Sequence, residues 1–157
     1  MYKMYKKVIV GIDDDDHAES ILGAAIKIAK EVKSKIIIAS SIPFMLDSAY
    51  GYNSIEGGLM SSYIGPTAEQ IDDQVHNRKQ LIEALVAKIV CDDEVEVEII
   101  VSLEDAKDLI LGIAAKYEQS LIVLGATSKK SIERFFVGSV AQYIVNNAPT
   151  DVYLIKA

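Results

Sequence analysis

Short apolar runs alternate along the chain with longer stretches in which apolar residues recur every three or four positions. Four runs with apolar centres lie at residues 8–12, 35–40, 121–124 and 152–155. Continuous runs of this length predict strands that are buried on both faces. The helical spacing predicts helices from residue 16, over 67–90, from about 105 and over 139–147.

The stretch at residues 94–101 has a different pattern, in which apolar and acidic side chains alternate at first. Val95, Val97 and Ile99 alternate with Glu94, Glu96 and Glu98. A period of two predicts a strand with one face in water, near an edge of the sheet.

Polar residues at two of the helix starts match capping patterns. Thr67 and Gln70 have the spacing of a capping box, and Asp16 with Glu19 is a second candidate pair. We expect each pair to satisfy backbone N–H groups in the first turn of its helix.

Strands that alternate with helices predict a parallel sheet with right-handed crossovers. We therefore expect an α/β fold: a doubly wound, mostly parallel five-stranded sheet with helices on both faces, an α/β/α sandwich. No internal repeat or linker is visible, so we expect one domain over residues 1–157. Residues 43–65 lack periodicity, and we expect a flexible segment there: a lid, a partner surface or plain disorder.

Composition narrows the class of protein. The chain has 157 residues and a single cysteine, Cys91, so it cannot form an internal disulfide. No stretch approaches the ~20 apolar residues that span a bilayer. A net charge of -7 and the absence of tryptophan weigh against nucleic-acid binding. We expect a soluble, cytoplasmic protein that contacts neither membranes nor nucleic acid.

The strongest candidate site follows the run at residues 121–124. Gly125 ends that run, and Gly138 and Ser139 stand at the start of the next helix. Glycines let a backbone approach a phosphate closely, and the free N–H groups of a helix start favour anions. Taken singly, each residue is better explained by a strand end or a helix cap than by a phosphate site.

The spacing of these residues resembles the Gly-x2-Gly-x9-Gly-Ser/Thr pattern of universal stress proteins that bind ATP. Gly125, Gly138 and Ser139 match in register, while Ser128 stands where the family has its second glycine. The first strand with its acidic turn at Asp13, and the closing segment 138–149, are also similar to that family.

The resemblance implies binding of ATP or another adenine nucleotide, with little or no hydrolysis, by a stress-response regulatory protein. Asp13 would accept hydrogen bonds from the adenosine part, and the glycine loop would surround the phosphates. The residues expected to bind nucleotide are Ile12, Asp13, Gly125, Ala126, Thr127, Ser128, Gly138, Ser139 and Val140. We expect no catalytic residue.

Four consecutive aspartates, Asp13 to Asp16, follow the first strand. Their carboxylates suit Mg²⁺ held alongside a nucleotide, or they cap the helix and face water. The two histidines have no further ligand at zinc spacing, so we expect no metal site apart from Mg²⁺ that accompanies nucleotide.

The resemblance also implies a homodimer in which the terminal strand at residues 152–155 pairs across a two-fold axis. An alternative function is a dimeric protein-interaction module that binds no nucleotide and uses unknown protein partners. An electron-transfer or adenylate-forming enzyme is a third alternative, which rests only on the architecture.

Overall fold

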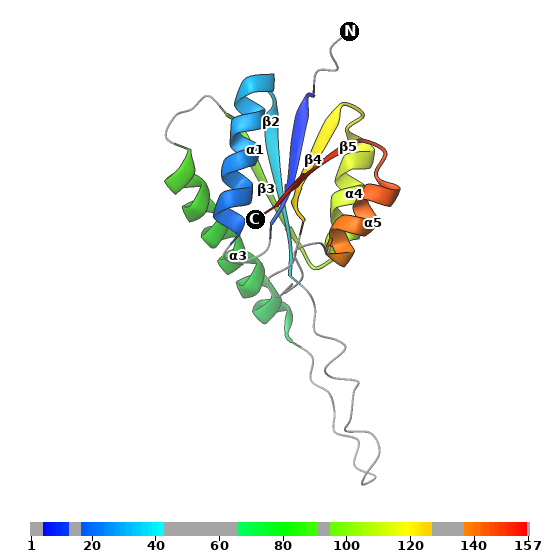
Figure 1. Cartoon of the computed structure of the whole chain (residues 1–157). Helices are drawn as coiled ribbons and strands as arrows, with labels where there is room; N and C mark the ends of the chain where they lie inside the picture. The colour runs from blue at the N-terminus through cyan, green and yellow to red at the C-terminus, as the bar shows by residue number, and fades with distance from the viewer. Residues whose placement is uncertain (1–4, 13–16, 43–65, 91–94, 127–136, 157) are drawn as a thin grey trace, which may run out of the picture.

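The computed structural model describes residues 5–12, 17–42, 66–90, 95–126 and 137–156 (Figure 1). Its elements alternate in type along the whole chain. In order they are β1 (Lys7–Gly11), α1 (Ala18–Val32), β2 (Lys35–Ser41), α3 (Ala68–Ile89), β3 (Val97–Ser102), α4 (Ala106–Lys116), β4 (Ser120–Gly125), α5 (Ser139–Asn147) and β5 (Asp151–Ile155).

The strands form one sheet in the order β3-β2-β1-β4-β5, and every neighbouring pair is parallel. The order runs outward from β1 in both directions, so β1 and β4 flank the point at which the winding reverses. The predicted doubly wound, five-stranded α/β sheet is therefore confirmed.

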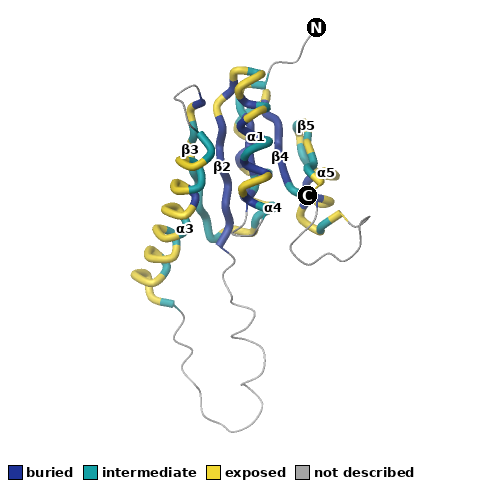
Figure 2. The backbone as a smooth tube through the Cα atoms, turned by 60° about the vertical axis from the view of Figure 1, so that its left-hand side comes forward, coloured by how far each residue is buried: buried dark blue, intermediate teal, exposed yellow. Residues whose placement is uncertain are grey.

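Helices cover both faces of the sheet, with α1 and α3 on one side and α4 and α5 on the other (Figure 1). Successive β1 side chains enter different layers: Val8 and Val10 pack with α1, whereas Ile9 packs with α4 and α5. The continuous apolar runs are explained by this two-sided burial, and Figure 2 shows β2 and β4 buried almost throughout.

The edge strand β3 is partly exposed to solvent, as its alternating sequence predicts. Glu98 is exposed, and Val97 and Ile99 are only partly buried. The strand begins at Val97, which pairs with Ile36, rather than at residue 94. Residues 91–94, which include Cys91, lie outside the described residues.

One of the two predicted helix caps forms and the other does not. The Thr67 hydroxyl accepts from the Gln70 backbone N–H, and the Gln70 side chain accepts from the Thr67 N–H. The prediction for α1 was wrong, because its N-cap is His17 rather than Asp16, and the His17 side chain forms no capping hydrogen bond. Glu19 lies inside the first turn, where its charge complements the helix dipole instead.

Within the described ranges, no helix is long and apolar enough to cross a bilayer.

A tyrosine preceding β1 holds the start of the edge strand β5. The Tyr5 hydroxyl donates to the Asp151 carboxylate at 2.6 Å, and this hydrogen bond raises the pKa of Tyr5 above its ordinary value. The bond therefore stabilises the fold below the ordinary tyrosine pKa of about 10, and this contribution disappears as the pH rises through the folded-state value.

We predict that Tyr5→Phe lowers the free energy of unfolding at pH 7 by at most about 1 kcal/mol, because the bond is solvent-exposed. Urea unfolding of both proteins between pH 7 and 11.5 tests this. The difference between them should shrink above pH 10, and a difference that grows there would contradict the assignment.

Candidate nucleotide site

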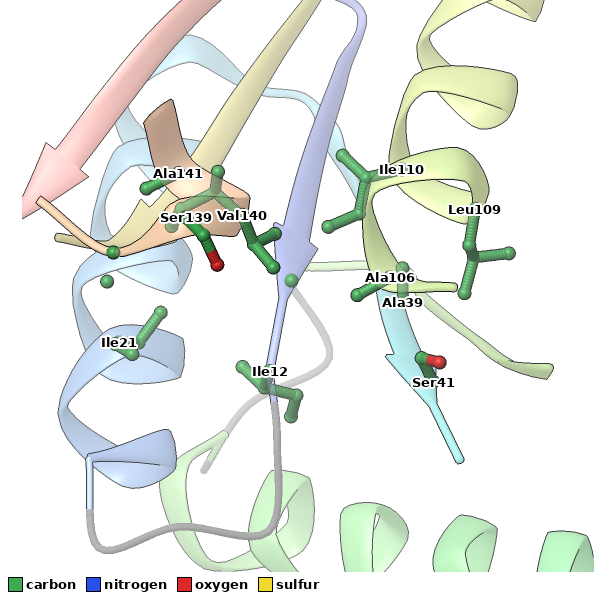
Figure 3. Close-up of a pocket in the computed structure, with 14 residues that line it drawn as sticks. Ile12, Ile21, Ala39, Ser41, Ala106, Leu109, Ile110, Ser139, Val140 and Ala141 are labelled. Carbon is green, nitrogen blue, oxygen red and sulfur yellow. The ribbon is translucent and has the colours of Figure 1, made fainter. Parts of the chain in front are cut away.

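A cavity opens at the carboxyl ends of the strands, where β1 and β4 stop pairing (Figure 3). The β1–β4 ladder ends at Val10 and Val123. Beyond that point Gly11 continues alongside β2, while Leu124 and Gly125 continue alongside β5. The two halves of the sheet therefore separate at the reversal point, which is where ligands bind in open α/β folds.

Six elements, the residue after β1 and the residue before α5 line the cavity. The lining residues are Gly11, Ile12, Ile21, Ala39, Ser41, Ala106, Leu109, Ile110, Leu124, Gly125, Gly138, Ser139, Val140 and Ala141. Most of these side chains are aliphatic, and the hydroxyls of Ser41 and Ser139 come from different elements, β2 and α5 (Figure 3). The walls suit a flat, weakly polar group, with hydrogen bonding left to a few points.

The N-terminus of α5 supplies the polar side of the cavity. Gly138 is the N-cap, and no side chain in the described part of the chain caps the helix. The first N–H groups of a helix have no partner within it, and the first turn of α5 carries no acidic residue. Ser139 and Val140 are exposed there. These donors and the helix dipole favour an anion at this end of the cavity.

A pair of backbone hydrogen bonds determines where α5 begins. The Gly138 N–H donates to the Ala126 carbonyl at 2.8 Å, and the Ala126 N–H donates to the Ile155 carbonyl at 2.8 Å. Ala126 thus joins the start of α5 to the end of β5. Residues 127–136, which lie between Ala126 and Val137, are outside the described residues.

The structure brings five of the nine predicted binding residues to one cavity: Ile12, Gly125, Gly138, Ser139 and Val140 line it. Ala126 is buried and acts through its backbone bonds rather than as a lining residue. The other three predicted residues, Asp13, Thr127 and Ser128, lie outside the described residues, as do Asp14 to Asp16 and the segment 43–65. Within the described part of the chain, no three acidic, histidine or cysteine side chains converge as metal ligands.

The sequence analysis missed the wall opposite α5. Ala39 and Ser41 belong to β2, and Ala106, Leu109 and Ile110 belong to α4. The β2 residues could have been predicted from their position in the strand. The carboxyl ends of neighbouring parallel strands meet at the same edge of the sheet, so the last residues of β2 lie near those of β1. Nothing in the local sequence of α4 distinguishes its cavity side from ordinary core.

The similarity of this protein to a known family extends over almost the whole chain. The Universal stress protein family is matched over residues 4–156. The chain belongs to that family.

Individual relatives are distant but extend over the full length. The chain is 22% identical to a universal stress protein from Synechocystis, over 97% of this chain and 98% of that protein. Its fold is similar to that of UspA from Lactobacillus plantarum, with a TM-score of 0.73, 23% identity and coverage of 97% and 98%. A universal stress protein from Archaeoglobus fulgidus, solved in complex with dAMP, has a TM-score of 0.61, 24% identity and coverage of 98% and 99%.

Close packing in the cavity wall leads to a prediction about Gly11. A Cβ atom there would lie 2.7 Å from both Ile110 Cδ1 and Leu124 Cδ2. We predict that Gly11→Ala lowers the free energy of unfolding by about 1 kcal/mol, measured by urea denaturation, because the two atoms that must move are terminal methyl groups of flexible side chains.

Gly112→Ala is the matched control, because nothing lies within 4 Å of a Cβ added at this position of α4. It should stabilise the protein by up to about 1 kcal/mol, since alanine favours the helix. Equal effects of the two substitutions would show that the packing at Gly11 is looser than described.

Proposed function

We propose that this protein binds an adenine nucleotide, ATP or another, in the cavity at the β1–β4 reversal, and acts in the cytoplasm as a stress-response regulatory protein. The apolar walls would take the adenosine part, and the start of α5 would take the phosphates. In the outer parts of the predicted loop, Gly125, Gly138, Ser139 and Val140 would contact the nucleotide. Asp13, Thr127 and Ser128 remain in the proposal on the strength of the family pattern.

One observation carries the proposal: the N-terminus of α5, whose N-cap Gly138 has no side chain, borders an apolar cavity that residues from β1, β2 and α4 complete. A nucleotide has the same division into an aromatic base and an anionic tail. The Archaeoglobus relative, which was solved with dAMP, supports the adenine class of ligand.

We propose that the nucleotide is held with little or no hydrolysis. Among the described lining residues none carries a carboxylate, an imidazole or a cationic side chain. Hydrolysis of a phosphoanhydride needs a group that orients water and positive charge on the phosphates. Any Mg²⁺ would enter with the nucleotide, and its oxygen ligands would come from phosphates and from the aspartates after β1.

Calorimetry with AMP, ATP and adenosine, with and without Mg²⁺, tests this function. We predict that wild type binds AMP more tightly than adenosine, because the start of α5 meets the phosphate. Gly138→Asp should remove that preference and weaken AMP binding by about tenfold or more, since the carboxylate both captures the free N–H groups and repels the phosphate.

The Gly138→Asn variant is the control for shape, because its amide caps the helix without charge. Gly138 has φ -58° and ψ 155°, which any residue adopts at an N-cap, so both variants should fold. Gly138→Asn should lie between wild type and Gly138→Asp in AMP affinity. Wild type that binds no nucleotide at millimolar concentration would leave the interaction module as the function.

We further propose that the protein forms a homodimer through β5. This strand is an edge of the sheet, with Tyr153 half exposed, and Tyr143 and Val145 of α5 are exposed large apolar residues nearby in the chain. An unpaired parallel edge with apolar side chains invites pairing with a second copy. The same surface favours the alternative function as a dimeric interaction module.

We predict that Tyr153→Lys shifts the protein toward monomer in sedimentation velocity at micromolar concentration, because a charge on an edge strand opposes pairing. Leu81→Lys is the control, since Leu81 is 63% exposed but lies on α3, across the sheet from β5. A wild-type monomer, or monomer formed by both variants alike, would contradict the assignment of β5 as the interface.

A further inference from the structure

The long helix α3 is weakly packed against the rest of the domain. Of its 22 residues only Ile82 is buried. Leu85, Val86 and Ile89 add partial packing in the C-terminal half, whereas most of the first half is exposed (Figure 2). Van der Waals contacts alone therefore hold the first half of α3 only loosely.

Arg78 connects this loosely packed helix to the end of β2. Its Nη1 donates to the Ser40 hydroxyl oxygen at 2.9 Å and to the Ser41 carbonyl at 3.5 Å. Ser40 is almost completely buried, with 1% of its surface exposed. A guanidinium that serves two acceptors at a buried strand end determines the position of both the strand and the helix.

The same strand end is part of the cavity wall. Ser41 lines the cavity, and its hydroxyl donates to the Glu104 carbonyl. The Glu104 N–H in turn donates to the Ser102 hydroxyl oxygen at 3.1 Å, directly before Asp105 caps α4. Hydrogen bonds thus link α3 through Ser41 to Glu104, which directly precedes the N-cap of α4. Helix α4 belongs to the same cavity wall as the end of β2.

We propose that Arg78 is a positioning residue that couples occupancy of the cavity to the docking of α3 on the domain. Arg78 does not line the cavity; it acts through Ser41. When a ligand presses on the β2 end, the guanidinium transmits the restraint to the first half of α3, which has little other packing. The coupling rests on the proposed nucleotide function, whereas the anchoring by Arg78 does not.

Lysine cannot replace arginine fully in this position. Both hydrogen bonds come from Nη1, which lies one bond farther along the side chain than the Nζ atom of a lysine would. A lysine ammonium keeps the charge and three donors but ends short of the position that Nη1 occupies. Loss of the side chain would leave the Ser40 hydroxyl, inside the domain, without this donor. Arg78→Lys should therefore retain part of the effect and Arg78→Met little of it.

Hydrogen exchange of the ligand-free protein tests the anchor. We expect Arg78→Met to raise the exchange rate of amides in residues 71–78 by about fivefold or more, which corresponds to roughly 1 kcal/mol. Lys79→Met is the matched control, because it removes the same charge from the exposed neighbouring position. Equal exchange in the two methionine variants would overturn the role of Arg78.

Exchange with saturating AMP tests the coupling. In wild type, AMP should slow exchange in the first half of α3, where no residue lines the cavity, as well as in Ala106–Ile110, where three do. In Arg78→Met the protection at residues 106–110 should persist and the protection in α3 should disappear, with Arg78→Lys between the two.

General destabilisation would reduce both kinds of protection together, so selective loss in α3 separates positioning from stability. Protection of α3 that survives in Arg78→Met would overturn the coupling. Failure of wild type to bind AMP would remove the proposed function and the coupling, while the ligand-free comparison would still decide whether Arg78 anchors α3.

Discussion

The end of the β1–β4 ladder is the constraint on which the candidate site depends. A buried strand must pair its N–H and C=O groups with neighbouring backbone. After Val10 and Val123, β1 keeps its pairing with β2 and β4 keeps its pairing with β5, so the two strands diverge. The cavity occupies the space between the diverging strands, and α1, α4 and α5 enclose it.

Two local features determine the shape of that space. Gly11 lets Ile110 and Leu124 approach the β1 backbone more closely than any side chain there would permit. Ala126, bonded to both Ile155 and Gly138, sets the start of α5 beside the end of β5. The N-terminus of α5 therefore lies beside the cavity because β4 and β5 remain paired at this point.

Much of the fold could be predicted from short-range pattern, because buried parallel strands and amphipathic helices leave distinct signals. The structure has the predicted buried strands around Val8 and Ile122 and the partly exposed strand at Val97. It also has the predicted capping box at Thr67. The cap of α1 was wrong, since the adjacent acidic residues offered several equivalent starts and the helix begins after His17. The predicted limits of the strands differ from the observed limits by a few residues, because pairing with the neighbouring strand decides where a strand begins. Strand β3, for example, begins at Val97, which pairs with Ile36.

The candidate site, like the fold, was predicted only in part from the sequence. By itself the sequence determined the strand and helix types, the family pattern at Gly125, Gly138 and Ser139, and hence one side of the cavity. Only the tertiary structure placed Ala39, Ser41 and Leu109 in the opposite wall and brought Arg78 to the end of β2. The physical reason is distance along the chain: Arg78 and Ser40 are 38 residues apart and carry no local signal of contact. Sheet order and helix packing bring such residues together, and these depend on the whole core.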